Sequence, residues 1–351
     1  MATIKEIAKL ANVSIATVDR VIHNRGRVST DTKKKIEQII KELNYKPNLL
    51  ARQLKLSKNY KFGVLMPELH QDSKYWERPA LGIYKAKKEL EGHNIEIKFF
   101  HFNRYSEASF FNKSNQILKE NLDGLLMTPI LIHPAKEFTW KIPKEIPYVF
   151  FDSDIPDSNR LTFIGQDPYR SGRLAAKLMQ MMTGNEGSIV IIRILPEDYH
   201  IDQRIEGFKK YYIDNNENNS VQIYEWQEQK DLSSFDIVSQ KILEEQSDLQ
   251  GIFVTNALTY LIASFFESHC SKKNVRIIGY DLIKQNVDYL RSEIIDFLIS
   301  QSPLTQGYQG IYSLYRYLVL KQNVDDKIMM PIDIVTKENI DFYKYSSKDT
   351  V

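Results

Sequence analysis

The sequence predicts a small all-α domain followed by a larger α/β body whose parallel sheets form two lobes. Three observations support this fold class. Residues 1–61 carry three amphipathic helical patterns and a net charge of +9, from ten Lys and four Arg against five acids. From Phe62 onward, short apolar runs alternate with helical patterns, which is typical of parallel sheets covered on both faces. The length of 351 residues also exceeds what one hydrophobic core usually organises.

The first helix is expected to begin near Thr3, because Thr3 and Glu6 fit a capping box. Its apolar face is formed by residues at helical spacing, Ile4, Ile7, Ala8 and Ala11. Asn12 and Val13 make a turn, and Ser14 is a good N-cap for a second helix. The apolar stripe of that second helix consists of Val18, Val21 and Ile22. This arrangement leaves an outer face that contains Ile15, Ala16, Asp19, Arg20 and His23. Such a face is what a recognition helix presents to a DNA major groove.

The stretch VSTDTKKKIEQIIKELNY predicts a third helix, with hydroxyl groups to cap it and an apolar stripe of Ile36, Ile39, Ile40 and Leu43. The basic loop HNRGR before it is well placed to lie along phosphate groups, which position a protein on DNA without reading sequence. The alternative is a solvated, basic three-helix cap, because amphipathic helices with polar outer faces are common.

The next stretch, NYKPNLLARQLK, favours DNA binding. Pro47 ends the third helix and opens a short segment with Leu50, Ala51 and Leu54 on one side. A helix of about nine residues is marginal in water on its own. It would become ordered when two copies pair on DNA, with Leu54 inserted into the minor groove as an apolar wedge.

Over its full length, TIKEIAKLANVSIATVDRVIHNRGRVSTDTKKKIEQIIKELNYKPNLLARQLK resembles the helix-turn-helix and hinge of the LacI/GalR family of bacterial transcription regulators. The resemblance implies a homodimer on a near-palindromic double-stranded operator, with Ile15, Ala16 and Arg20 at base edges. Asp19 departs from the small hydroxyl residue of many members, so the family's usual operator does not transfer unaltered. The DNA-contacting residues expected here are Thr3, Ser14, Ile15, Ala16, Thr17, Asp19, Arg20, His23, Asn24, Arg27, Asn48, Ala51, Leu54 and Lys55.

The remaining chain divides into alternating strands and helices. Strands are expected at FGVLMP, IEIKFF, GLLMTP, PYVFFD, LTFIG, GSIVIIRI, VQIYEW, GIFVT, VRIIGYD and DFLIS. Helices are expected near residues 79–91, 107–121, 169–182 and 259–268, around IDQRIEGFKKYY, and between VQIYEW and GIFVT. We predict a helix-turn-helix domain at 1–46, a hinge helix and linker at 47–61, a body at 62–340 and a tail at 341–351. The N-lobe is assigned 62–162 and 292–320, and the C-lobe 163–291 and 321–340, with the split near Phe163–Pro168.

Ligands of open α/β sheets bind outside the carboxyl ends of the strands, where this chain carries polar and aromatic residues. The candidates are Tyr75, Trp76, Asp152, Ser153, Arg204, Asn256, Asp281 and Gln301. Taken singly, each has a commoner role: an aspartate as a helix cap, Arg204 as a surface charge, Asn256 as a loop former and Trp76 as core. Together they provide the donors, acceptors and aromatic face that a polyhydroxylated ring requires.

Residues 62–340 resemble the sugar-sensing body of the same family, which is similar to the type I fold of periplasmic ribose-type binding proteins. The resemblance implies that Tyr75 and Trp76 form an aromatic pair against the ligand. It also implies polar ligand contacts from Asp152, Arg204, Asn256, Asp281 and Gln301. The chain departs at Ser153, where ribose-type proteins have an arginine, and ELHQDSKYW lacks their asparagine. Ribose itself is therefore disfavoured, whereas a related monosaccharide, a sugar acid or another cyclic polyol stays open.

The composition excludes several other classes. No apolar run approaches the roughly 20 residues that span a bilayer. The N-terminus lacks the order of a secretory signal, so a cytoplasmic location is expected. The single cysteine, Cys270, is interpreted as a packed thiol, and we expect no metal and no cofactor. Neither a nucleophile elbow nor a phosphate-binding glycine loop is present, and the tail lacks the leucine heptads of a coiled-coil tetramer.

The sequence thus predicts a dimeric transcription regulator, controlled by a small molecule bound between the lobes. The sign of that control, the operator and the ligand stay open. The alternatives are a solute-binding protein or an enzyme on the same two-lobed scaffold.

Overall fold

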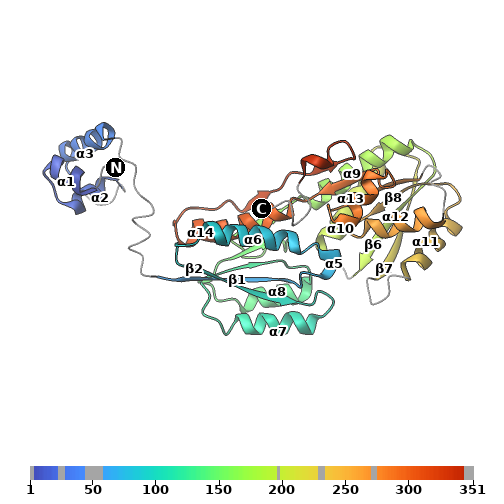
Figure 1. Cartoon of the computed structure of the whole chain (residues 1–351), viewed down its shortest axis with the longest axis horizontal. Helices are drawn as coiled ribbons and strands as arrows, with labels where there is room; N and C mark the ends of the chain where they lie inside the picture. The colour runs from blue at the N-terminus through green and yellow to red at the C-terminus, as the bar shows by residue number, and fades with distance from the viewer. Residues whose placement is uncertain are drawn as a thin grey trace. The chain divides into compact units, whose positions relative to one another are not determined.

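The computed structural model describes residues 4–22, 28–43, 58–195, 198–227, 234–269 and 275–343. The chain separates into two compact units, Met1–Lys58 and Asn59–Val351 (Figure 1). No described helix is both long enough and apolar enough to cross a membrane. The expected hinge residues 47–57, the tail from residue 344 and Cys270 lie outside the described residues.

The described residues of the first unit form three helices, α1 (Ile4–Ala11), α2 (Ile15–Ile22) and α3 (Thr30–Glu42). They enclose a small core built from the predicted apolar stripes, with Ile7, Ala8, Ala11, Val18, Val21 and Ile36 buried. Asn12 takes a left-handed conformation (φ 57°) and turns the chain between α1 and α2. Ser14 then caps α2 by accepting a hydrogen bond from the Thr17 N–H at 3.2 Å. Ser29 caps α3 in the same way, through the Thr32 N–H.

The described residues of the second unit form two six-stranded sheets, whose orders are β11-β5-β4-β3-β1-β2 and β12-β10-β9-β8-β6-β7. The first sheet consists of β1 (Tyr60–Pro67), β2 (Ile95–Phe102), β3 (Gly124–Met127), β4 (Tyr148–Phe151), β5 (Thr162–Gly165) and β11 (Lys327–Met329). The second consists of β6 (Ser188–Leu195), β7 (Ser220–Gln227), β8 (Leu249–Val254), β9 (Arg276–Tyr280), β10 (Phe297–Ser300) and β12 (Asp333–Val335). All pairings are parallel except that of β12 with β10. The predicted class of parallel α/β sheets is therefore confirmed.

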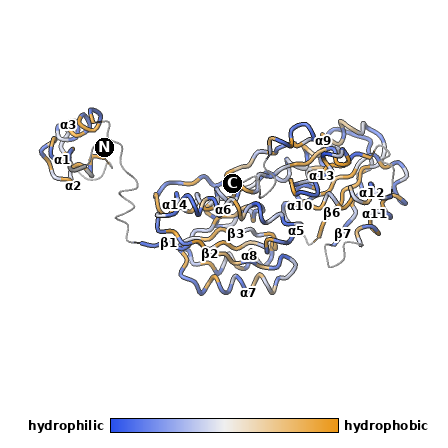
Figure 2. Tube along the Cα trace, in the orientation of Figure 1, coloured by the Kyte–Doolittle hydropathy of each residue, from blue (hydrophilic) through white to orange (hydrophobic). Residues whose placement is uncertain are grey.

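Helices cover both faces of each sheet, and Figure 2 shows apolar residues along the strands beneath them. The first sheet lies between α6 (Glu77–Glu89) with α14 (Pro303–Leu318) on one face and α7 (Glu107–Ile117) with α8 (Ile132–Lys141) on the other (Figure 1). In the second sheet, Ile189 and Ile191 share a core with α9 (Pro168–Thr183) and α10 (Tyr199–Asp214). Val190 and Ile192 point to the opposite core, which is covered by α11 (Ser234–Glu245), α12 (Thr259–His269) and α13 (Lys284–Arg291). This alternation follows from the two-residue period of a strand.

The division of the chain between the lobes differs from the prediction. Residues 163–165 of β5, assigned to the C-lobe, belong to a strand that pairs with β4 in the first sheet. The strand Phe297–Ser300, assigned to the N-lobe, pairs with β9 in the second. Of the returning segment 321–340, β11 joins the first sheet and only β12 joins the second. The reason is that strands this short are equally apolar in both sheets, so their composition carries no information about their partners. The chain consequently crosses between the lobes at residues 166–167, 301–302 and 330–332.

Two helix pairs pack backbone against backbone through reciprocal glycines. A Cβ atom on Gly172 of α9 would lie 2.0 Å from the Arg204 carbonyl oxygen, and one on Gly207 of α10 would lie 2.0 Å from that of Tyr169. In the first lobe, a Cβ atom on Gly82 of α6 would lie 1.9 Å from the Leu304 carbonyl oxygen. Only glycine permits this approach, which sets the position of α10 and hence of Arg204.

Candidate functional site

Polar side chains that follow the strands of both sheets meet at a buried cavity of about 30 Å³. The lining residues are Asp72, Tyr75, Trp76, Arg104, Asp152, Asp198, His200, Ile201, Arg204, Asn256, Ala257, Asp281 and Gln301. All of the predicted ligand residues except Ser153 are among them. Asp72, Arg104, Asp198 and His200 were not predicted. The cavity lies at the carboxyl ends of the strands, which is where open α/β sheets bind ligands.

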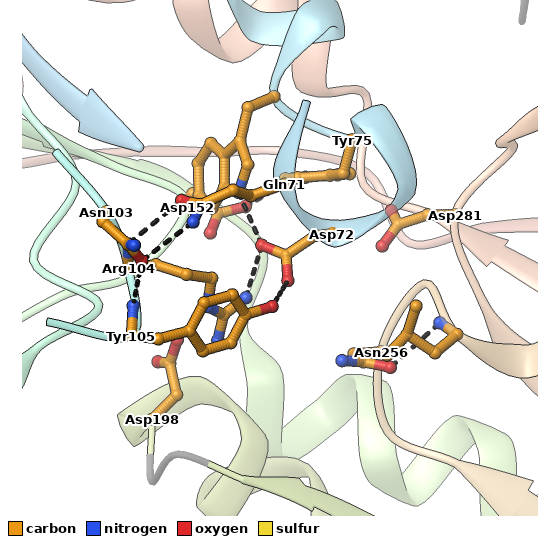
Figure 3. A network of polar contacts seen from close by, with 12 residues as sticks. Gln71, Asp72, Tyr75, Asn103, Arg104, Tyr105, Asp152, Asp198, Asn256 and Asp281 are labelled. Atoms are coloured by element: carbon orange, nitrogen blue, oxygen red, sulfur yellow. Dashed lines mark hydrogen bonds and ion pairs between the residues drawn. The ribbon is translucent and has the colours of Figure 1, made fainter. Parts of the chain in front are cut away.

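The first lobe contributes a carboxylate, Asp72, that sequence reasoning missed. It belongs to α5 (Gln71–Lys74), in which Asp72, Ser73 and Lys74 all have left-handed backbone angles of 50°, 53° and 71°. Asp72 forms a buried ion pair with Arg104 and accepts hydrogen bonds from the indole N–H of Trp76 at 2.5 Å and the Tyr105 hydroxyl at 3.4 Å (Figure 3). These bonds hold the Trp76 ring in place. The rings of Tyr75 and Trp76 meet edge to face, with their centroids 5.0 Å apart.

Asp152 is the second carboxylate of the first lobe, directly after β4. It has a left-handed φ of 69°, and its backbone N–H donates to Gln306 Oε1 at 2.8 Å. The Tyr75 hydroxyl donates to Asp152 Oδ1 at 2.5 Å. Burial raises the pKa of Tyr75, so this phenol stays protonated and donates. Burial also raises the pKa of Asp152, although His200 and the Tyr75 hydrogen bond oppose that rise.

In the second lobe, Gln301 links Arg204 to Asp281. The Gln301 amide nitrogen lies 3.0 Å from both carboxylate oxygens of Asp281, and its oxygen accepts from Arg204 Nη2 at 2.5 Å. Arg204 is 1% exposed, also donates to the Thr255 carbonyl, and stacks 3.8 Å above the Tyr280 ring. Burial raises the pKa of Asp281 to about 7, against the opposing effects of Arg204 and Gln301. Arg204 is therefore a buried site residue and not a surface charge.

Asp198 and His200 begin α10 on the same side of the cavity. Asp198 Oδ1 accepts from the His200 N–H at 3.3 Å and lies 2.8 Å from His200 Nδ1. Ser153 reaches across from the first lobe and donates to the same oxygen at 3.1 Å. Burial opposes the ionisation of Asp198, but His200, its hydrogen bonds and Arg104 hold its pKa below the ordinary value. Ser153 thus joins the two lobes without lining the cavity.

No group of three or more metal-ligating side chains occurs among the residues that the structure describes.

A larger cavity of about 450 Å³ shares Asp152 and His200 with the 30 Å³ cavity and is also lined by Tyr169, Tyr199 and Lys327.

The predicted DNA-contacting face is partly described. On α2, Val18 and Val21 are buried, whereas Ile15 is 49% exposed and Arg20 is exposed. Ser14 and Thr17 form a hydroxyl pair at the start of this helix. Ala16 and Asp19 belong to α2, but their side chains are outside the description. Several other expected DNA-contacting residues lie entirely outside the described residues, namely Thr3, His23, Asn24, Arg27, Asn48, Ala51, Leu54 and Lys55.

Comparison with known proteins gives matches to both units. Residues 3–48 match the family described as bacterial regulatory proteins, lacI family, and residues 62–322 match the periplasmic binding protein domain. A ribose operon repressor from Lactococcus lactis is 26% identical over 97% of this chain and 98% of its own length.

Solved structures agree with this picture. The structure of a proposed LacI transcriptional regulator from Bacteroides fragilis is 30% identical and covers 82% of this chain and 100% of its own, with a TM-score of 0.76. A solute-binding protein from Burkholderia graminis in complex with D-arabinose is 18% identical over 82% of this chain and 99% of its own, with a TM-score of 0.72. The second likeness shows the shared fold alone.

Proposed function

Because the chain belongs to the LacI family of bacterial regulatory proteins and is a DNA-binding transcription regulator, we propose that it represses genes from a near-palindromic operator, under control of a sugar-like molecule bound between its lobes. One observation carries the ligand half of this proposal. Side chains of both lobes, Asp152 from the first and Arg204 and Asp281 from the second, converge on one buried cavity.

The chemistry of the cavity favours a polyhydroxylated ligand. A sugar hydroxyl donates to a carboxylate such as Asp152 or Asp281 and accepts from a guanidinium such as Arg204. Trp76 and Tyr75 add an aromatic wall, against which the C–H face of a sugar ring packs. A neutral monosaccharide, or a cyclic polyol of similar size, matches these groups.

Ligand binding on this scaffold requires a change in lobe closure. The cavity of about 30 Å³ has room for only about one or two water molecules, so a sugar enters only when the lobes separate or side chains turn. The larger neighbouring cavity, which shares Asp152 and His200, offers additional room. A ligand that contacts both lobes then favours one degree of lobe closure. Through this change in closure, the sugar would alter the affinity of the protein for its operator.

For the DNA half, we propose that two copies of the chain bind the two operator half-sites, each with α2 in a major groove. The exposed Ile15 and Arg20, opposite the buried Val18, support this orientation. Residues 47–57 would supply the paired hinge helices, and the protein would act in the cytoplasm, where bacterial DNA lies.

Neither alternative has comparable support. A protein that only carries a solute has no need of the three-helix unit with its exposed basic residues. For an enzyme, Ser153, Asp198 and His200 would be the candidate nucleophile, acid and base. Ser153 and His200 both approach Asp198 Oδ1 and so do not form a serine–histidine pair. We therefore propose no catalytic step.

A thermal-shift screen tests the ligand half. The full chain is heated with neutral monosaccharides, polyols, sugar acids, sugar phosphates and nucleosides, in parallel with Asp281→Ala. A ligand at 100 times its dissociation constant stabilises the folded state by about 2.7 kcal/mol, which raises the unfolding midpoint measurably. We expect a neutral sugar or polyol to raise the midpoint of the wild type and not that of Asp281→Ala.

Asp214→Ala is the matched control, because Asp214 ends α10 in an ion pair with Arg173 away from the cavity. It should respond to the same sugar as the wild type does. A screen in which no compound raises the wild-type midpoint contradicts the ligand half of the proposal and leaves the DNA half standing.

A further inference from the structure

We propose that Arg104 and Asp198, which face each other from opposite lobes, form a subsite that binds one neutral hydroxyl group of the ligand. The inference rests on the proposed function and adds to it a requirement on the ligand. Arg104 follows β2 of the first sheet, and Asp198 precedes α10 of the second lobe. Figure 3 shows the Asp198 carboxylate beside the Arg104 guanidinium.

Each residue has a buried polar atom whose bonding capacity is unused. Arg104 is 6% exposed and Asp198 is 1% exposed, and both line the 30 Å³ cavity. Among the contacts of the described residues, Arg104 Nε donates to no acceptor and Asp198 Oδ2 accepts from no donor. A buried polar atom without a partner is costly, and such atoms in a native site are explained by a missing water, ion or ligand.

The surrounding residues hold both groups in place. Arg104 is anchored by its ion pair with Asp72, by the Tyr105 ring 5.5 Å away, and by a hydrogen bond from its backbone N–H to Gln71 Oε1 at 3.0 Å. On the other side, Ser153 and His200 occupy Asp198 Oδ1. Oδ2 is therefore the acceptor that Asp198 has left to offer.

The pairing of these groups selects the chemistry of the ligand. Arg104 Nε needs an acceptor and Asp198 Oδ2 needs a donor, and a hydroxyl group is both at once. An ammonium group in this position would meet the positive charge of Arg104. A carboxylate or phosphate would meet the negative charge of Asp198. Each charged alternative thus has one like-charged neighbour in a buried site, whereas a neutral hydroxyl has none.

The subsite also links ligand chemistry to lobe closure. Arg104 and Asp198 attract each other, yet no direct ion pair joins them among the described contacts. One hydroxyl bound to both would bridge the lobes at this point, next to the direct bridge from Ser153 to Asp198. A ligand that lacks this hydroxyl would lose the hydrogen bonds to Arg104 and Asp198, and with them this bridge between the lobes.

Titration calorimetry on the full chain tests this inference. D-Ribose, D-arabinose, D-galactose and D-tagatose are titrated into the wild type, and the tightest binder is carried forward with its monodeoxy derivatives. The variants are Asp198→Asn, which keeps a good N-cap for α10, and Arg104→Lys, which keeps the charge opposite Asp72 but loses the Nε donor. Arg160→Lys is the matched control, because Arg160 is an equally buried arginine that pairs with Asp154 outside the 30 Å³ cavity.

We expect both site variants to weaken binding of the chosen sugar by about 10- to 100-fold, and Arg160→Lys to leave it nearly unchanged. One monodeoxy derivative should lose a similar factor on the wild type and lose nothing further on Asp198→Asn. If Arg104→Lys fails to fold, titration of the monodeoxy derivatives into the wild type and Asp198→Asn still tests the subsite.

Two outcomes are distinguishable failures. If a neutral sugar binds the wild type and both variants equally well, or the deoxy and Asp198→Asn losses multiply, the subsite is wrong and the proposed function survives. If none of the four sugars binds the wild type, while a sugar acid or phosphate does in the thermal-shift screen, the neutral-hydroxyl requirement falls together with the neutral-sugar ligand.

Discussion

Asp281 is a carboxylic acid whose charge state depends on burial. Its pKa is raised to about 7 in the folded protein, from an ordinary value of 3.8. Between these values the folded protein holds a proton that the unfolded chain has released, so the fold loses stability as pH rises. The stabilising effect of the neutral form is complete below pH 3.8 and is lost as pH rises through about 7.

Asp281→Asn should therefore become more stabilising as pH rises. Asparagine reproduces the neutral acid in shape but does not ionise. We expect the free energy of unfolding of the variant, relative to the wild type, to increase by about 2 to 3 kcal/mol between pH 5 and pH 8. Denaturant unfolding at both pH values measures it, with the exposed Asp326→Asn as the control. An equal difference at both pH values would mean that Asp281 is ionised throughout this range.

Arg20 is the residue on which base reading is expected to depend most. Its side chain is exposed on α2, opposite the buried Val18. If it binds a guanine with two hydrogen bonds, Arg20→Ala should cost about 1 to 3 kcal/mol at one base pair of each half-site. Lys41→Ala is the control, because Lys41 is an exposed cation near the end of α3 outside the expected DNA-contacting set, and it should leave the ratio of operator to random-DNA affinity unchanged. Equal losses for Arg20→Ala on operator and random duplexes, measured by fluorescence anisotropy, would refute a base-reading role.

Sequence reasoning found most of the cavity residues because parallel strands end at one edge of a sheet. Tyr75, Asp152 and Asp281 each follow a strand, and local sequence suffices to place them. Arg104 also follows a strand, so the same rule would have found it. Asp72 depends on three successive left-handed residues, which no local pattern indicates. Ser153 lies in the predicted loop, but its hydroxyl is bound to Asp198.

At the scale of elements, the crossing of α9 and α10 determines where Arg204 lies. A side chain on Gly172 would collide with the Arg204 carbonyl oxygen, which belongs to the backbone and cannot turn aside. The helices would have to separate, and Arg204 would move away from Gln301 and Asp281.

Gly172→Ala should therefore lower both stability and ligand affinity. We expect the free energy of unfolding to fall by about 1 to 3 kcal/mol, as in other overpacked cores. Affinity for the neutral sugar identified in the screen should fall more than tenfold, measured by calorimetry. Gly82→Ala creates a comparable collision with the Leu304 carbonyl oxygen in the other lobe, so it should lower stability without moving Arg204. Unchanged sugar affinity in Gly172→Ala would show that the crossing does not position the site.

Two of the helices that the sequence did not predict, α14 and α8, have weak helical signals. The helix α14 contains Gly307, Gly310 and several tyrosines, all of them weak helix formers, and packing against α6 stabilises it. The helix α8 carries Pro134 near its start, which obscures the helical pattern. By contrast, α1, α2 and α3 have clear apolar stripes and N-terminal capping signals.

At the scale of the whole molecule, three short crossings join the lobes, at 166–167, 301–302 and 330–332. Side-chain bonds add to them: Ser73 meets the Tyr260 hydroxyl at 3.0 Å, and Gln166 donates to the Ser300 carbonyl at 2.7 Å. Because the crossings are short and lie outside the strands, we expect closure to change by rotation of the lobes about them, with these side-chain bonds broken and each sheet keeping its register.

If sugar and operator binding are coupled through closure, each must change the affinity for the other by the same factor. Titrating the sugar with and without a bound operator duplex should give two dissociation constants that differ by about 5- to 150-fold. The direction of the change shows whether the sugar releases or promotes repression. Identical constants would contradict the coupling, and Asp281→Ala should abolish the sugar effect while leaving DNA affinity intact.

The last described segment contributes a strand to each sheet within a few residues: β11 pairs with β5, and β12 pairs with β10. Met330 packs in the core of the first lobe, whereas Val335 and Ile340 pack in that of the second. A stop codon shortly after residue 320 would thus remove an edge strand from both sheets at once, although it removes less than a tenth of the 351 residues. In a genetic screen for derepressed cells, such late nonsense alleles should be recovered as complete loss-of-function mutations.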